Sequence, residues 1–201
     1  MIEKRRKLKS FDLCSRSKPW LRKSCILSTF NKFRPIPVRL GPSCPRLKSL
    51  DLRENKFRGS IPESLGSASS LETLFLSGNE LTGLVPSSLG DNCTKLQFLG
   101  LATNHLSGPL PNSIGKCQRL THLALHNNML SGCVPYAVQH LSNLACLQLW
   151  RNRLTGIADG LDLRLLTALH TLNLAKNPLE QKEGLERYLA RYLPPTCQVY
   201  L

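Results

Sequence analysis

His122 and Cys146 are the two residues whose types and spacing could form a nucleophilic pair. They occupy the same position in two similar segments, and on adjacent strands their side chains would lie about 5 Å apart. An imidazole beside a thiol can withdraw its proton and leave a nucleophilic thiolate. The sequence shows no acid to orient the imidazole and no oxyanion hole. Two neighbours on one surface are therefore the better interpretation, and no enzyme is expected.

Other catalytic and cofactor-binding motifs are missing from the sequence. It has no Gly-rich phosphate loop, no G-x-S-x-G, no H-E-x-x-H and no C-x-x-C. His122 and His126 would share a strand face but lie about 13 Å apart, which is too far for one metal ion. We therefore expect no catalytic residue, no metal site and no cofactor.

Exposed aromatic and basic side chains suggest instead the binding of another chain. Single exposed apolar residues are common on surfaces, but two clusters on one face favour a protein or peptide ligand. The first cluster lies in the N-terminal half and the second in the C-terminal half. We expect Phe75 to contribute less than Trp150, because no basic residue stands beside Phe75 in its own segment. The predicted ligand-binding residues are Phe75, Phe98, His122, His126, Gln148, Trp150 and Arg151.

The segments that must position these residues are six repeated units, spaced by 24 or 25 residues. Each unit reads L-x-x-L-x-L-x-x-N, with the opening Leu as position 1 and the Asn as position 9. The units open at Leu47, Leu71, Leu96, Leu120, Leu144 and Leu169. The Asn residues are Asn55, Asn79, Asn104, Asn128, Asn152 and Asn177.

This pattern predicts how each unit folds. L-x-L alternates like a strand and points both Leu side chains to one face, so positions 3, 5 and 7 face the other way. The Asn side chain can bond loop backbone that would otherwise stay unpaired in the interior. One unit cannot bury its Leu face alone, so neighbouring units must stack into a solenoid with a parallel sheet.

The second half of each unit is more specific. Gly59, Gly83, Gly108 and Gly132 are each followed by one residue, an aliphatic residue and Pro. This L-x-G-x-I-P pattern resembles the plant-type leucine-rich repeat family over roughly residues 30–180. That family includes ectodomains of receptor kinases, receptor-like proteins and polygalacturonase-inhibiting proteins. The resemblance implies an α/β right-handed horseshoe, with short parallel strands on the concave face and loops and short helical turns on the convex face.

The N-terminal part departs from the repeats. Residues 1–46 carry a net charge of +11, against +3 for residues 47–201. We interpret residues 1–21 as a basic, disordered head or a wrongly joined upstream stretch. A nuclear or transit signal is the weaker alternative. Residues 22–46 resemble a decayed first repeat that caps the solenoid, with Ser28 where the repeat has Leu.

After the repeats of residues 47–176, residues 177–201 are predicted to form a C-terminal cap and tail. Leu185, Leu189 and Leu193 recur at helical spacing within residues 180–193, and two Pro residues follow. This pattern resembles intracellular caps more than the paired-Cys caps of secreted members. It leads us to expect a chain finished at residue 201, with no kinase or anchor downstream.

The cysteines and the search for targeting signals give evidence about the cellular compartment of the protein. Cys44, Cys93 and Cys117 each precede an opening Leu by three residues, which predicts three small buried thiols rather than disulfides. No signal peptide or membrane span is recognisable. These features favour an intracellular protein, whereas the family resemblance implies the cell surface or the extracellular space. The triplet Asn92-Cys93-Thr94 could be glycosylated only in a secreted chain.

Three functions remain open at this point. The first is a non-enzymatic module that binds a protein or peptide on its concave sheet, with a monomer favoured. The second, implied by the resemblance, is a secreted or cell-surface recogniser or inhibitor in signalling or defence. The third and least favoured is nucleic-acid binding through the basic head, because no reader fold accompanies it.

Overall fold

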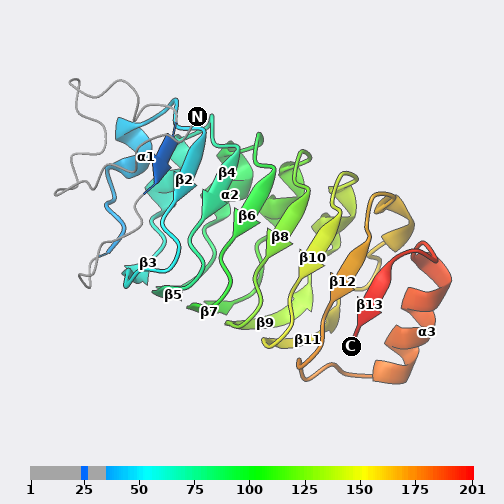
Figure 1. Ribbon diagram of the computed structural model, residues 1–201. Helices are drawn as coiled ribbons and strands as arrows, with labels where there is room; N and C mark the ends of the chain where they lie inside the picture. The colour runs from blue at the N-terminus through cyan, green and yellow to red at the C-terminus, as the bar shows by residue number, and fades with distance from the viewer. Residues whose placement is uncertain (1–23, 27–34) are drawn as a thin grey trace, which may run out of the picture.

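The computed structural model describes the backbone of residues 24–26 and all of residues 35–201 (Figure 1). Predictions that fall on residues 1–23 and 27–34 lie outside the described residues. Within the described part, one side of the molecule is an eight-stranded parallel sheet. Its strands are β1 (Ser24–Ile26), β2 (Ser49–Asp51), β4 (Thr73–Phe75), β6 (Phe98–Gly100), β8 (His122–Ala124), β10 (Cys146–Gln148), β12 (Thr171–Asn173) and β13 (Gln198–Tyr200).

Each repeat places the same position beside the same position of the next repeat. Leu50 pairs with Leu74, and Leu74 pairs with Leu99, in unbroken parallel register. The Leu residues of positions 1, 4 and 6 are nearly or fully buried and form one continuous core along the solenoid. This arrangement confirms the predicted α/β repeat solenoid.

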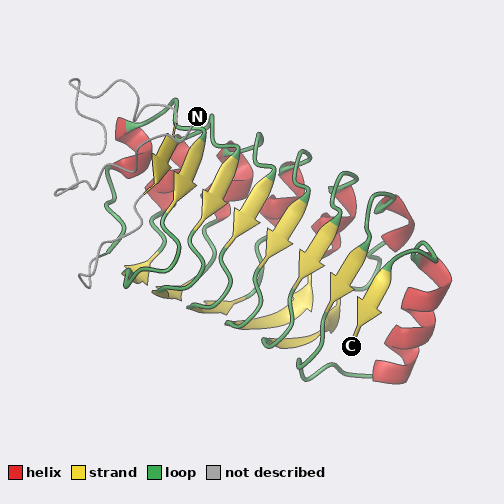
Figure 2. Cartoon of the chain, in the orientation of Figure 1, coloured by secondary structure: helices red, strands yellow, loops and turns green. Residues whose placement is uncertain are grey.

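A second parallel sheet, which the sequence did not predict, lies behind the first (Figure 2). It forms from the segments around the repeat glycines. Gly83, Gly108 and Gly132 keep positive φ angles of 79°, 73° and 74° inside or beside these strands. The strands are β3 (Arg58–Ser60), β5 (Glu80–Gly83), β7 (His105–Gly108), β9 (Met129–Val134) and β11 (Arg153–Ile157).

Short helical segments cover the remaining side and are of two types, α and 3-10. After Leu89 the 25-residue unit closes an α-turn, with the Cys93 amide donating to the Leu89 carbonyl at 3.1 Å. The 24-residue unit instead closes a 3-10 turn, with the Cys117 amide donating to the Ile114 carbonyl at 3.0 Å. The segments are α1 (Leu40–Ser43), η2 (Glu63–Ser67), α2 (Ser87–Asn92), η3 (Asn112–Lys116), η4 (Tyr136–His140) and η5 (Leu163–Leu165).

The Asn residues at position 9 tie neighbouring units together. Asn104 accepts a hydrogen bond from the Leu81 amide at 3.0 Å through Oδ1. Its Nδ2 donates to the carbonyls of Leu76 at 3.0 Å and Leu101 at 3.1 Å, one in the preceding unit and one in its own. Each such side chain thus satisfies backbone groups of two units that face the interior. The same bridging pattern holds at Asn79, Asn128, Asn152 and Asn177.

The two ends of the sheet differ from the sequence predictions in detail. β1 pairs Cys25 with Leu50, whereas the position assigned to Ser28 would have placed Ile26 there. The decayed segment lacks the Leu pattern that fixes register in other units, so this register was wrong by one residue. At the other end, α3 (Lys182–Tyr192) lies where a helix was expected, but strand β13 was not predicted.

The cysteines require one correction. Cys44 is disulfide-bonded rather than a free thiol. Recurrence at one repeat position carries no information about whether a cysteine forms a disulfide, so the prediction for Cys44 was wrong. Cys93 and Cys117 are buried free thiols as predicted, and burial raises their pKa to about 11 and about 12.

Among the described residues, no helix has both the length and the apolar character needed to cross a membrane.

Candidate ligand-binding face

The concave sheet is the face on which the predicted binding residues gather. Positions 3, 5 and 7 of each unit point away from the Leu core, because side chains alternate along a strand. The successive strands β4, β6, β8 and β10 lie side by side, so residues of one column are neighbours in space (Figure 1). The face therefore presents columns of side chains running across the repeats.

An aromatic row of Phe75, Phe98 and His122 occupies the N-terminal half of this face. The rings of Phe75 and Phe98 are tilted, with centroids 6.3 Å apart, and His122 stacks on Phe98 at 4.8 Å. The Arg53 guanidinium lies 4.7 Å from the centroid of the Phe75 ring. Phe75 thus has a basic neighbour from the preceding unit, although none stands beside it in its own unit. A search within a single unit could not find a contact between units.

Asp51 holds Arg53 in this position. The Arg53 side chain donates to both carboxylate oxygens of Asp51, at 3.0 and 2.8 Å. Burial of Asp51 opposes its ionisation, but the hydrogen bonds and charge of Arg53 together outweigh it, so the pKa of Asp51 lies below its ordinary value. The charge of Arg53 is therefore matched locally, and its planar group is oriented over an aromatic ring.

The aromatic pair of His126 and Trp150 occupies the C-terminal half. Their ring centroids lie 4.7 Å apart and their planes differ by 8°. Nδ1 of His126 is buried and has no hydrogen-bond partner among the described residues. Burial disfavours the charged imidazolium and lowers the pKa of His126. The pair is therefore a flat and mainly uncharged surface.

Gln148 and Arg151 lie next to this pair in the chain but use their side chains differently. Nε2 of Gln148 donates to the Cys146 sulfur at 3.4 Å, so its amide is partly engaged. Arg151 is exposed, and its side chain has no ion pair or hydrogen bond within residues 35–201. The structure brings His126 and Trp150 into direct contact, whereas Arg151 only borders them.

A floor of small residues separates the two halves, and sequence reasoning did not single it out. Gly100 and Ala124 take position 5 of the third and fourth units, and Ala102 takes position 7 of the third. A Cβ on Gly100 would lie 3.0 Å from Cδ1 of Phe75, so that ring leans across the glycine. The sequence could have indicated this feature, because small residues stand at these positions between the units that carry Phe75 and Trp150.

His122 and Cys146 are register partners on β8 and β10, yet they do not form a nucleophilic pair. Nδ1 of His122 lies 2.9 Å from the Thr121 hydroxyl, and the described contact of the Cys146 sulfur is with Gln148. In the part of the chain that the structure describes, no group of three potential ligands could hold a metal ion.

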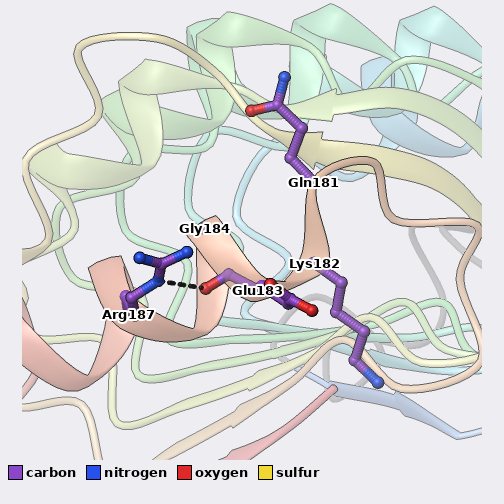
Figure 3. A pocket seen from close by; sticks show the side chains of 5 residues that line it. All are labelled: Gln181, Lys182, Glu183, Gly184 and Arg187. Atoms are coloured by element: carbon purple, nitrogen blue, oxygen red, sulfur yellow. Dashed lines mark hydrogen bonds between the residues drawn. The ribbon is translucent and has the colours of Figure 1, made fainter.

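A surface depression at the start of α3 lies at the C-terminal end of the solenoid (Figure 3). It is lined by Gln181, Lys182, Glu183, Gly184 and Arg187. Arg187 donates to the Glu183 carbonyl at 3.4 Å, within the same helix. These exposed polar groups belong to one element, and they offer no apolar surface comparable with the aromatic pair.

Comparison with known proteins supports the repeat assignment. A family model described as Leucine rich repeat matches residues 45–106. A probable LRR receptor-like serine/threonine-protein kinase of Arabidopsis thaliana is 41% identical over 51 residues, which are 25% of this chain and 5% of that protein. The chain thus spans only a small part of this curated relative.

Solved structures of plant receptor ectodomains are similar over a longer stretch. The ectodomain of the receptor kinase GASSHO1/SCHENGEN3 from Arabidopsis thaliana, in complex with CASPARIAN STRIP INTEGRITY FACTOR 2, is 35% identical, with a TM-score of 0.73. The match covers 77% of this chain and 18% of that one. The plant peptide hormone receptor RGFR1, in complex with RGF2, is 30% identical over 77% of this chain and 28% of its own, with a TM-score of 0.69.

The ectodomain of BIR2 from Arabidopsis thaliana is closer in length. It is 30% identical, and the match covers 65% of this chain and 67% of that one, with a TM-score of 0.56.

Proposed function

This chain belongs to the plant-type leucine-rich repeat family, and from that premise we propose that its concave sheet binds a protein or peptide ligand. The observation that carries the proposal is the contact between His126 and Trp150, two flat rings stacked on the open face of the sheet. Aromatic side chains of this kind bury much area at small entropic cost, and they are the usual anchors of interfaces.

The aromatic row supports the same face. Phe75, Phe98 and His122 form a second anchor, and Arg53 adds an oriented charge above Phe75. Ala102 and Ala124 add little bulk between the anchors, and the Phe75 ring occupies the space over Gly100. Two of the similar ectodomains are described in complex with a named factor or a peptide hormone ligand, which supports a ligand of the same kind here.

A capture experiment tests the proposal. Immobilised protein would retain partners from a cell extract, and isothermal titration calorimetry would then measure the affinity of the partner found. Trp150→Ala should weaken binding about tenfold or more, because truncating such an anchor typically removes about 2 kcal/mol of binding free energy. The melting temperature should fall only modestly, because Trp150 is half-buried on the concave face and lies outside the Leu core.

Tyr136→Ala is the matched control. Tyr136 is 50% exposed and lies on η4, on the opposite side of the molecule from the concave sheet. We expect this variant to bind like the parent. A partner lost with Tyr136→Ala and kept with Trp150→Ala would place the binding surface on the other face.

We further propose that the chain works at the cell surface or outside the cell. The disulfide at Cys44 suits an oxidising compartment, and the matched relatives include receptor ectodomains. Asn92 and Thr94 of the glycosylation triplet are both exposed. Protein from plant cells should lose mass on glycosidase treatment, and the Asn92→Gln variant should not. A chain with no glycan and a free Cys44 thiol would contradict this location.

A further inference from the structure

Residues 92–158 contain no Asp and no Glu. This stretch spans the middle of the solenoid and contains six of the seven predicted binding residues, all except Phe75. Its basic residues are Lys95, Lys116, Arg119, Arg151 and Arg153. The first acid after the stretch is Asp159, which precedes η5 and not a concave strand. The charge that this stretch leaves beside the concave strands is therefore positive and comes from Arg151 and Arg153, because Lys116 lies on η3 and pairs with Asp91.

The charge at position 8, shortly after the concave strands, changes sign along the solenoid. Position 8 holds Glu54 in the first unit, but Arg151 and Lys176 in the fifth and sixth. Position 10 holds Lys56 in the first unit, Glu80 in the second and Arg153 in the fifth. We call Arg151, Arg153 and Lys176 the basic rim. Its members are neighbours, since the Arg151 amide donates to the carbonyl of Ala175 at 2.8 Å, directly before Lys176.

Bases near the N-terminal half are paired, whereas the basic rim is not. Arg53 pairs with Asp51, and Arg58 pairs with Glu80, each at 2.8 Å. Within residues 35–201, none of the three basic-rim residues forms a salt bridge, and all three are exposed. These charges are therefore free to meet charges of a bound partner.

We propose that the ligand segment bound beside Trp150 is an acidic, extended stretch of polypeptide with two or more carboxylates. This inference rests on the proposed function and specifies the chemistry of its ligand. Opposite charges within about 10 Å attract at moderate ionic strength, and a guanidinium can take a carboxylate in a paired geometry. A basic segment at the same place would be repelled, and a neutral one would gain nothing from the rim.

A long polyanion such as a nucleic acid fits this face less well. In the N-terminal units Lys48, Arg53 and Arg58 are paired with Glu72, Asp51 and Glu80, so that end offers a long charged backbone little unpaired basic surface. A peptide whose acidic part is confined to the C-terminal half needs only the basic rim. The position of the rim therefore also orients the ligand, with its acidic stretch toward units five and six.

Backbone geometry allows two of the basic-rim charges to be removed without strain in the backbone. Arg151 and Lys176 have left-handed φ angles of 55° and 58°, and Asn127 occupies the same position with 55°. Asn adopts this conformation more readily than Arg or Lys do. Arg151→Asn and Lys176→Asn should consequently keep or improve stability while they remove two charges. Arg153→Gln completes the rim variant.

The test uses the full chain and two fluorescein-labelled synthetic peptides. The acidic probe is Tyr-Glu-Asp-Glu-Asp-Tyr, and the neutral probe Tyr-Gln-Asn-Gln-Asn-Tyr has nearly the same shape. Fluorescence anisotropy at low and at moderate salt gives the affinities. We expect the parent to prefer the acidic probe about tenfold, with the preference falling as salt rises. The rim variant should lose the preference.

A charge-matched variant separates a site from mere net charge. Lys95→Gln, Lys116→Gln and Arg119→Gln remove the same number of positive charges from exposed positions outside the rim, one of which, Lys116, is paired with Asp91. This variant should keep most of the preference. Equal loss in both triple variants, equal binding of both probes by the parent, or stronger competition by a single-stranded oligonucleotide than by the acidic peptide would overturn the proposal.

Trp150→Ala, measured with the acidic probe, distinguishes this inference from the proposed function. Loss of binding with both Trp150→Ala and the rim variant supports the two together. If Trp150→Ala loses binding and the rim variant keeps it, the concave face stands and the acidic ligand is wrong. If only the rim variant loses binding, the rim binds acidic chains but the face around Trp150 is not the anchor.

Discussion

The imidazole of His126 lies almost parallel to the indole of Trp150, with ring centroids 4.7 Å apart and planes 8° from parallel. The contact joins position 7 of two adjacent units, so it exists only because the parallel strands keep their register. Nδ1 of His126 is buried and has no hydrogen-bond partner in the described structure. The stack therefore links the shape of the binding face to the protonation of one side chain.

Acidification should lower the stability of the fold through His126. Burial lowers its pKa below the ordinary value of about 6.5, so between the two values the unfolded chain binds more protons than the folded chain. The free energy of unfolding consequently falls as pH drops through about 6.5, and this contribution levels off below the folded-state pKa. Melting temperatures measured between about pH 8 and pH 5 would show the decline.

His126→Phe is the variant that isolates this effect, because it keeps an aromatic ring beside Trp150 and cannot titrate. It should flatten the decline, and the His126 resonance in an NMR titration should give a pKa below that of an unfolded peptide. An unchanged pH profile in His126→Phe would show that other groups cause the decline.

Asn104→Ala should destabilise the protein by roughly 1–3 kcal/mol, because it leaves buried backbone groups of two units without partners. Asn104 is only 5% exposed, so water cannot replace the lost bonds. Chemical denaturation would measure the change. Asn112→Ala is the control, since Asn112 is exposed on η3 and should change stability by less than about 0.5 kcal/mol. Equal effects of the two substitutions would contradict a bridging role for position 9.

The repeat pattern made the concave sheet predictable, because Leu50, Leu74 and their equivalents recur in one register and fix each strand by burial. The contact of His126 with Trp150 could also be predicted, because both residues take position 7 of adjacent units and paired strands place them side by side. The contact of Arg53 with Phe75 did not, because it depends on how far one side chain reaches across units.

The second sheet could not be predicted from the sequence, for a different reason. Its strands hold Gly83 and Gly108 at positive φ, and such residues are typical of turns in a sequence viewed one unit at a time. They pair only because the solenoid already stacks the units. The disulfide at Cys44 and the register of β1 likewise depend on a segment whose repeat pattern has decayed.

Gly90→Ala should be strongly destabilising, because a Cβ there would lie 2.2 Å from backbone atoms of Ser113 in the next unit. Neighbouring convex segments approach so closely that only glycine fits, and overpacking typically costs about 1–3 kcal/mol. Gly184→Ala is the matched control, since nothing lies within 4 Å of its Cβ position in helix α3. It should raise stability by up to about 1 kcal/mol, through higher helix propensity. Thermal denaturation should show a lower melting temperature for Gly90→Ala and a higher one for Gly184→Ala.

Removal of the C-terminal segment should expose the core of the last repeat. Leu185, Leu189 and Leu193 of this segment are at most 9% exposed, and strand β13 covers the edge of β12 through a bond from the Leu174 amide to the Tyr200 carbonyl at 2.7 Å. Truncation after Leu179 removes both layers, so the shortened chain should aggregate or melt earlier, as light scattering and circular dichroism would show.

A point variant tests the same role in a chain of full length. Leu189 is 1% exposed, so Leu189→Ala should cost roughly 2–5 kcal/mol by loss of apolar contact and creation of a cavity. Leu165→Ala is the control, because Leu165 lies on the neighbouring η5 but is 46% exposed and should cost much less. If α3 only rests on the surface, Leu189→Ala will unfold at nearly the same denaturant concentration as Leu165→Ala. A large difference between them requires that the helix packs as part of the core and shields the last Leu residues from water.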